Sequence, residues 1–195
     1  MKLKQQLKWL IIMLVGINGF AQKYHSDKLI PAASVDKYRA IGVSVNSDNR
    51  LFVSFPKQEE NYQYGLTEIV NGKRIPYPNE EWNKQGDEKD HFVNLQDLYV
   101  DANDFLWVLD SKPSPASSIF GDSGKVTEGQ FKLLKINTKT NQVERIYTFD
   151  DLDKAKSGLN DIRVDVKKNV AYFSDPGQAA IVVLDLKTGK TRKVL

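Results

Sequence analysis

The stretch LYVDANDFLWVLD, residues 98–110, decides the fold, because its pattern occurs twice more along the chain. The other copies are VSVNSDNRLFVSF, residues 43–55, and IRVDVKKNVAYFSD, residues 162–175. Each copy is an apolar strand, a polar turn and a second apolar strand. Such a repeat at a period of roughly 40–50 residues, with several strands in each unit, is typical of a β-propeller. Since propellers contain about four to eight blades, the three copies predict an all-β, partial propeller of about three blades.

The pattern divides residues 40–195 into three predicted blades, which cover about residues 40–78, 94–149 and 159–195. Asn71-Gly72 lies between two apolar runs of the first blade and is the strongest short signal for a β-hairpin. Residues 112–129 are rich in Ser, Pro and Gly, which predicts a long loop inside the second blade. The last strand of the third blade has no predicted neighbour, so we expect self-association through this open blade edge.

Residues 1–21 have the composition of a signal peptide. Three lysines precede an apolar run at residues 9–17 that is too short to span a bilayer, and small residues stand before the expected cleavage site. We therefore expect cleavage after Ala21, no membrane anchor after that cleavage, and a secreted or periplasmic protein. Residues 22–39 form a polar lead-in segment before the first blade.

Composition excludes several classes of function. The chain has no cysteine, which excludes disulfides, thiol catalysis and thiolate metal sites. The formal net charge is +3, but residues 1–21 contain three lysines and no acid, so the remaining chain is close to neutral. A basic outer hairpin near residues 187–193 lacks the aromatic platform that single-stranded nucleic acid needs. We expect no nucleic-acid partner.

Six stretches, in this order, together resemble the royal jelly and insect yellow protein family. They are IPYPNEEWN at 75–83, LWVLD at 106–110, LLKINTKT at 133–140, LNDIRVD at 159–165, AYFSD at 171–175 and VLDL at 183–186. The resemblance implies a secreted six-bladed propeller about twice as long as this chain, which matches its N-terminal half.

The resemblance also implies a function for the central channel. Insect members of the family include proteins linked to dopachrome conversion and others that bind small aromatic amines, and bacterial relatives are described as dopachrome-tautomerase-related. The chain is thus expected to bind a small aromatic or catechol-like molecule or to act on it, the reaction being an isomerisation like that of dopachrome tautomerase. The alternative is a small-amine-binding protein without turnover.

Candidate site residues are those at the ends of the inner strands of the predicted blades, since these strands line the channel of a propeller. Asn160 and Asp161 are the candidate catalytic residues. The candidate ligand-binding residues are Phe55, Asp97, Asp110 and Asp175. The oxygens of the aspartates and of Asn160 suit a hard divalent cation such as calcium, or the ammonium group of an amine, and Phe55 offers an aromatic face for a ligand. The sequence therefore does not decide whether the cofactor is a divalent cation.

Each candidate also has a structural interpretation. An aspartate at a strand end can bond to its own backbone, which we expect of Asp101 and Asp165 because both recur in the turns of the repeat. The aromatic residues Trp107 and Tyr172 suit the core between blades. The histidines, His25 and His91, lie in charged or N-terminal stretches and favour solvated loops over a catalytic triad.

A third functional class is a gluconolactonase-like, metal-dependent lactone hydrolase. Asn160-Asp161 at the start of an inner strand resembles the metal-binding Asn of those six-bladed propellers. They also carry a Glu on the inner strand of the first blade, where this chain has Arg39-Ala40-Ile41-Gly42 without an acid. The difference argues against a lactonase-type metal centre.

Overall fold

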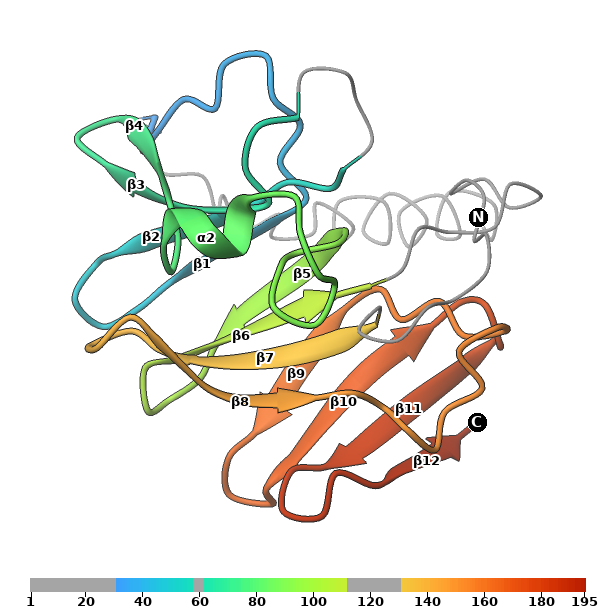
Figure 1. Cartoon of the computed structure of the whole chain (residues 1–195). Helices are drawn as coiled ribbons and strands as arrows, with labels where there is room; N and C mark the ends of the chain where they lie inside the picture. Colours follow the sequence, from blue (N-terminus) through green and yellow to red (C-terminus); the bar gives the residue numbers. More distant parts are fainter. Residues whose placement is uncertain (1–30, 58–61, 112–130) are drawn as a thin grey trace, which may run out of the picture. The chain divides into compact units, whose positions relative to one another are not determined.

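The computed structural model describes residues 31–57, 62–111 and 131–195. These residues form three consecutive four-stranded antiparallel sheets, so the predicted partial propeller of about three blades is confirmed (Figure 1). Blade one contains β1 (Gly42–Val45), β2 (Leu51–Ser54), β3 (Leu66–Val70) and β4 (Lys73–Pro76). Blade two contains β5 (Leu95–Val100), β6 (Phe105–Asp110), β7 (Lys132–Asn137) and β8 (Gln142–Tyr147). Blade three contains β9 (Ile162–Asp165), β10 (Val170–Asp175), β11 (Ala180–Asp185) and β12 (Thr191–Val194).

The hairpins form because an Asn or Asp opens the turn and a residue with positive φ closes it. In the first turn of blade two, Asp101 Oδ1 accepts hydrogen bonds from the backbone N–H groups of Asn103 (2.8 Å) and Phe105 (3.1 Å). Asp104 then adopts a φ of 62°, a conformation that Asn and Asp tolerate better than most residues. In the first turn of blade three, Asp165 Oδ1 likewise accepts hydrogen bonds from the backbone N–H groups of Lys167 and Lys168. The structural interpretation of both turn acids is therefore confirmed.

Two apolar layers hold neighbouring blades together. Between blades one and two the layer includes Phe52, Leu66, Leu98 and Leu106, each at most 2% exposed. Between blades two and three it includes Trp107 and Leu109 of β6 and, across the layer, residues of blade three (Ile162, Phe173, Val182 and Leu184). The alternating side chains of each strand thus serve two interfaces, as the pleat of a strand requires.

A short helix, α2 (Glu80–Asn83), follows blade one and was not expected from the sequence. Asn79 caps it by accepting a hydrogen bond from the Trp82 backbone N–H at 3.1 Å. The helix places Asn83 so that its Oδ1 accepts from the N–H groups of Gly65 and Leu66, at 2.9 and 3.0 Å. The helix therefore fixes the start of β3.

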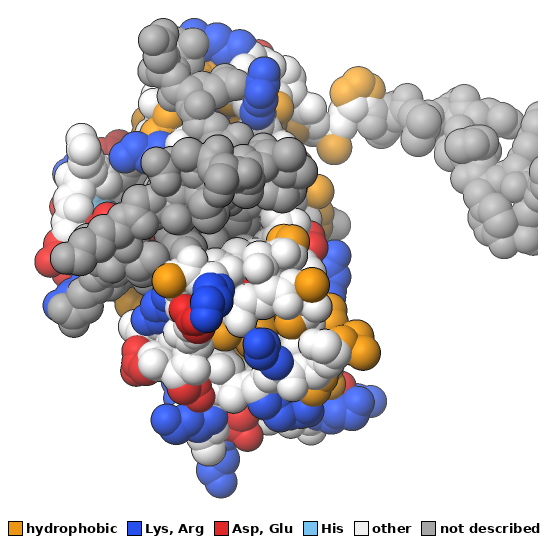
Figure 2. All heavy atoms as spheres, turned by 90° about the vertical axis from the view of Figure 1, so that its right-hand side faces the viewer, with side chains coloured by type: hydrophobic (Ala, Val, Ile, Leu, Met, Phe, Trp, Pro, Cys, Tyr) orange, Lys and Arg blue, Asp and Glu red, His pale blue; other side chains and the backbone are white. Residues whose placement is uncertain are grey.

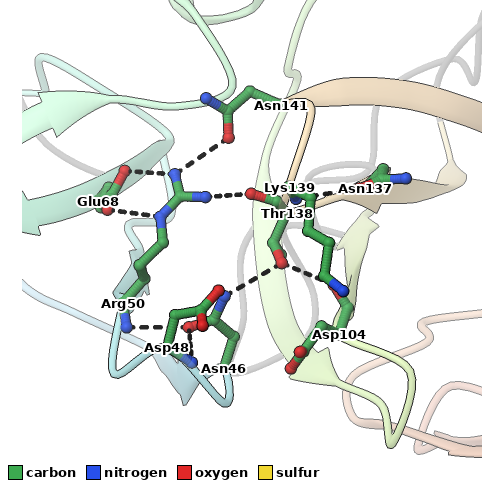
Figure 3. A network of polar contacts seen from close by, with 9 residues as sticks. All are labelled: Asn46, Asp48, Arg50, Glu68, Asp104, Asn137, Thr138, Lys139 and Asn141. Carbon is green, nitrogen blue, oxygen red and sulfur yellow. Dashed lines mark hydrogen bonds and ion pairs between the residues drawn. The ribbon is translucent and has the colours of Figure 1, made fainter.

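Polar side chains join the first turn of blade one to the turn between β7 and β8 of blade two (Figure 3). Arg50 forms two hydrogen bonds with the Glu68 carboxylate, at 2.8 and 2.7 Å, inside blade one. The same guanidinium donates to the Thr138 carbonyl and to Asn141 Oδ1 of blade two. Asn46 Nδ2 donates to the Thr138 hydroxyl at 3.1 Å. This network fixes the two blades against each other.

No helix in the described ranges has the length and hydropathy to cross a membrane. Charged side chains of both signs are interspersed over the face that Figure 2 shows, which fits the near-neutral composition after residue 21. The predicted signal peptide at residues 1–21 and the predicted loop at 112–129 lie outside the described residues, and so does the first half of the lead-in segment, residues 22–30.

Candidate functional site: the inner strands

The inner strands of the three blades are β1, β5 and β9, because hydrogen bonds between neighbouring blades run through them. The Val100 backbone N–H of β5 donates to Ser44 Oγ of β1 at 2.9 Å. The Ile162 backbone N–H of β9 donates to Asp97 Oδ2 of β5 at 3.1 Å. Inner strands line the channel of a propeller, so their exposed side chains are the candidate site.

Asp97 is half-buried at the junction of blades two and three. Besides the Ile162 N–H, its Oδ2 accepts a hydrogen bond from Arg163 Nη1 at 3.1 Å. A Cβ added to Gly42 of β1 would lie 3.3 Å from Asp97 Oδ1, so the carboxylate lies close to the inner strand of blade one as well. Asp97 therefore lies where all three inner strands approach one another.

Asn160 and Asp161 lie directly before β9. The Asn160 backbone N–H donates to the Ser174 carbonyl at 3.0 Å, and the Asp161 N–H donates to Ser174 Oγ at 3.1 Å. In return the Ser174 hydroxyl donates to Asp161 Oδ2 at 2.5 Å, and Asn160 Nδ2 donates to the same oxygen at 3.3 Å. No described residue donates to Asp161 Oδ1. Asp161 is thus an exposed carboxylate with a fixed orientation and one oxygen left for a ligand.

Arg163 and Tyr99 complete this group and were not among the predicted site residues. The Arg163 guanidinium carbon lies 5.7 Å from the centre of the Tyr99 ring, and its Nη1 pairs with Asp97. The signal for Arg163 was its position two residues after Asp161, since alternate residues of a strand share a face. Tyr99 gave no such signal, because the register of β5 is irregular between Leu95 and Leu98.

Asp110 is buried in the fold rather than exposed on the channel. It ends β6, is 0% exposed and forms an ion pair of 2.8 Å with Lys132 of β7, which is also fully buried. Its carboxylate accepts from the backbone N–H groups of Val93 and Asn94 as well. Burial raises the pKa of the Asp110 carboxyl, and the Lys132 ammonium opposes that rise. These contacts give Asp110 a structural role, and its ligand-binding role stays a prediction.

Asp175 occupies the matching position at the end of β10 in blade three. It is 1% exposed and accepts from Ser157 Oγ and from the Gly158 backbone N–H, each at 2.8 Å. Both aspartates therefore hold the backbone that leads into the inner strand of their own blade. In blade one, Phe55 occupies this position, 3% exposed, and its ring packs edge-on against Tyr38 at 6.4 Å. Ligand contacts of Asp175 and Phe55 likewise stay predictions.

Candidate metal ligands are not clustered within the described ranges, where no group of three or more His, Cys, Asp or Glu side chains is placed to hold a metal ion. Asn160, Asp161 and Asp97 supply two carboxylates and one amide, and one of the Asp97 oxygens already pairs with Arg163. We therefore derive no step through a divalent cation.

Comparison with known proteins gives one family and one solved structure. The family model described as major royal jelly protein matches residues 93–194, which is more than half of the chain. No curated protein matches. A solved structure that matches is the extracellular domain of a hybrid two component system from B. thetaiotaomicron, with a TM-score of 0.32 and 11% identity. The match covers 81% of this chain and 25% of that chain, so this chain spans about a quarter of its length.

Proposed function

Because the chain belongs to the major royal jelly protein family, we propose that it forms part of an exported propeller that isomerises a small aromatic or catechol-like molecule at its inner strands. The observation that carries the proposal is the state of Asp161. Its carboxylate is exposed and oriented by Ser174 and Asn160, yet Oδ1 accepts no hydrogen bond from any described residue. A catechol hydroxyl or an ammonium group is a suitable donor for that oxygen.

The proposed chemistry is a tautomerisation, as in the conversion of dopachrome. One C–H bond of the ligand breaks, and the proton moves to the Asp161 carboxylate. The protonated carboxyl then returns the proton to a quinone oxygen, where an O–H bond forms. No electrons leave the ligand, so the step needs no oxidant or reductant. Asn160 acts as a positioning residue because its side chain donates to Asp161.

Turnover of dopachrome by the purified chain tests this proposal, with Asp161→Asn as the variant. Loss of a positioned proton carrier lowers turnover by about 100-fold or more, whereas Asn keeps the size of the side chain. Asp165→Asn is the matched control, since Asp165 ends the strand that Asp161 precedes but bonds to its own turn. Turnover of Asp161→Asn at the wild-type rate would show that the proposal is wrong.

Binding without turnover is the second candidate, and the Arg163 guanidinium is the observation that favours it. This group lies beside Asp97 and Tyr99, and it serves recognition rather than proton transfer because a guanidinium offers N–H donors and no acceptor for a proton. Calorimetry with dopamine separates the two candidates. Saturable binding combined with no conversion of dopachrome assigns a binding role.

The proposed location is outside the cytoplasm, in the periplasm or the medium. Support comes from the basic start and the apolar run at residues 9–17. N-terminal sequencing of the protein recovered from its native source checks this proposal. A mature N-terminus at Gln22 is expected, and a chain that keeps Met1 would contradict it.

A further inference from the structure

The Arg163 side chain has N–H donors that no residue in the described ranges uses. Its Nη1 donates to Asp97 Oδ2 at 3.1 Å and to the Ile162 carbonyl, which accounts for both N–H bonds of that nitrogen. A guanidinium has five N–H donors in a rigid plane. No described residue accepts from Nε or Nη2, and the side chain is 67% exposed.

The remaining donors have the geometry of a carboxylate site. Nε–H and one N–H of Nη2 lie on the same edge of the guanidinium and point in parallel, which matches the two oxygens of a carboxylate. The contact with Asp97, only 18% exposed, holds the guanidinium in place before a ligand arrives. Such preorganisation lowers the entropy that binding must overcome.

Asp161 adds a cation-binding position beside this anion-binding position. Asp161 directly precedes β9, and its contacts with Ser174 continue the pairing of β9 with β10, in which Arg163 lies opposite Tyr172. Extended alternation then places Asp161 and Arg163 on one face, about 7 Å apart along the chain. Asp161 Oδ1 accepts no hydrogen bond from a described residue, as noted above. One free carboxylate oxygen and one free guanidinium edge are thus adjacent, and the Tyr99 ring lies 5.7 Å from the guanidinium carbon.

We propose that the inner-strand site selects aromatic ligands that carry both a carboxylate and an ammonium group, as an aromatic α-amino acid does. The carboxylate binds the Nε and Nη2 edge of Arg163, and the ammonium binds Asp161 Oδ1. This inference rests on the proposed function, because it names the ligand class of the same site. It predicts that the site binds such an amino acid more tightly than the corresponding amine without the carboxylate.

L-DOPA and dopamine test the inference, because they differ only in the carboxylate. Calorimetry on the purified chain is expected to show that L-DOPA binds about 10- to 100-fold more tightly than dopamine, which is the range for charge-assisted hydrogen bonds. Arg163→Gln is expected to remove this preference, because it removes the guanidinium edge that would bind the carboxylate of L-DOPA. Asp161→Asn should weaken the binding of both ligands, since both carry the ammonium.

Two further variants separate recognition from a structural role. Arg163→Lys keeps a cation for Asp97 but lacks the planar edge, so it is expected to fold normally and to lose most of the preference. Arg192→Gln is the matched control, because Arg192 is exposed and ends the same cross-strand row (Arg163, Tyr172, Val183, Arg192) on the outermost strand. Its preference should equal that of the wild type.

The outcomes distinguish failure of the carboxylate inference from failure of the proposed function. If neither ligand binds to the wild-type chain, the proposed function is wrong. If both bind equally and Arg163→Gln changes neither affinity, the carboxylate inference is wrong and the channel site stands. A tighter affinity for dopamine would also overturn the inference.

Discussion

Removing the positive charge of Lys132 should be among the most damaging single changes in this chain. Lys132 and Asp110 are both 0% exposed, and their charged groups are 2.8 Å apart between β6 and β7. In Lys132→Met the side chain keeps its approximate length, but the Asp110 carboxylate remains buried, and the described residues then offer it only backbone donors, from Val93 and Asn94. Breaking a buried ion pair on one side costs about 3–5 kcal/mol.

The expected loss is a large fraction of the total stability, which is about 5–15 kcal/mol for a typical domain. For a chain of this size it corresponds to a fall in the unfolding temperature of about 6–20 °C. Urea unfolding followed by tryptophan fluorescence at pH 7 measures it. The double variant Asp110→Asn with Lys132→Met should recover part of the loss, because it removes the unpaired charge and keeps an acceptor for the backbone N–H groups.

The pH dependence of Lys132→Met gives the sharper test. Without Lys132, burial raises the pKa of Asp110 further in the folded state, because only the backbone N–H groups of Val93 and Asn94 then oppose it among the causes known for this group. A carboxyl with a raised folded pKa contributes stability below its unfolded pKa, near 3.9, and loses that contribution as the pH rises through the folded pKa. The variant should therefore regain stability from pH 7 to pH 5, by up to about 1.4 kcal/mol per pH unit relative to wild type.

Lys135→Met supplies the matched control on the same strand. Lys135 pairs with Glu144 at 3.4 Å, and the two side chains are 25% and 39% exposed, so its loss should cost at most about 1 kcal/mol. The reasoning is refuted if Lys132→Met costs no more than Lys135→Met at pH 7. A cost for Lys132→Met that is equal at pH 5 and pH 7 would refute the electrostatic part of it.

Two further predictions concern the blade interfaces. Arg50→Met should lower the free energy of unfolding by about 2 kcal/mol, because it removes two charged hydrogen bonds to a partly buried Glu68 and two bonds to blade two. Urea unfolding measures this loss, and Arg192→Met, at an exposed position, is the control. A loss no greater than that of Arg192→Met would contradict the prediction. Val43 is 66% exposed on the face of blade one that corresponds to the buried face of Leu98 in blade two, at 2%. We expect concentration-dependent self-association in sedimentation velocity that Val43→Glu reduces and Ile146→Glu does not, and a wild-type chain that stays monomeric at its highest soluble concentration would rule this out.

The blades were predictable because each hairpin carries its own local signal. Asn71-Gly72 has φ values of 51° and 73°, as its dipeptide indicates. Asp101 and Asp165 accept hydrogen bonds from the turns that follow them. Such contacts span two to four residues, so the sequence contains both partners within one short window. The apolar alternation of the strands then places the core.

The site was less predictable because its contacts join distant residues. Asp97 receives hydrogen bonds from Ile162 and Arg163 in the next blade. The register between β5 and β6 also shifts between Leu95 and Leu98, which breaks the simple alternation just where Asp97 stands. Asp110 was expected at an open strand end, but Lys132, placed opposite it by the pairing of β6 with β7, lies beyond the long insertion in the sequence.

The candidate aspartates differ in how many of their carboxylate oxygens already accept hydrogen bonds within the fold. Asp110 and Asp175 accept at both oxygens and are at most 1% exposed, so a ligand would have to displace bonds that hold the inner strands in place. Asp161 accepts at Oδ2 alone among the described residues, from Ser174 and Asn160. Binding a cation at Asp161 Oδ1 therefore breaks no contact of the fold, whereas binding one at Asp110 costs the desolvated ion pair with Lys132. The same sequence signal, an aspartate at a strand end, thus predicts structure where both oxygens are satisfied and a site where one is left exposed.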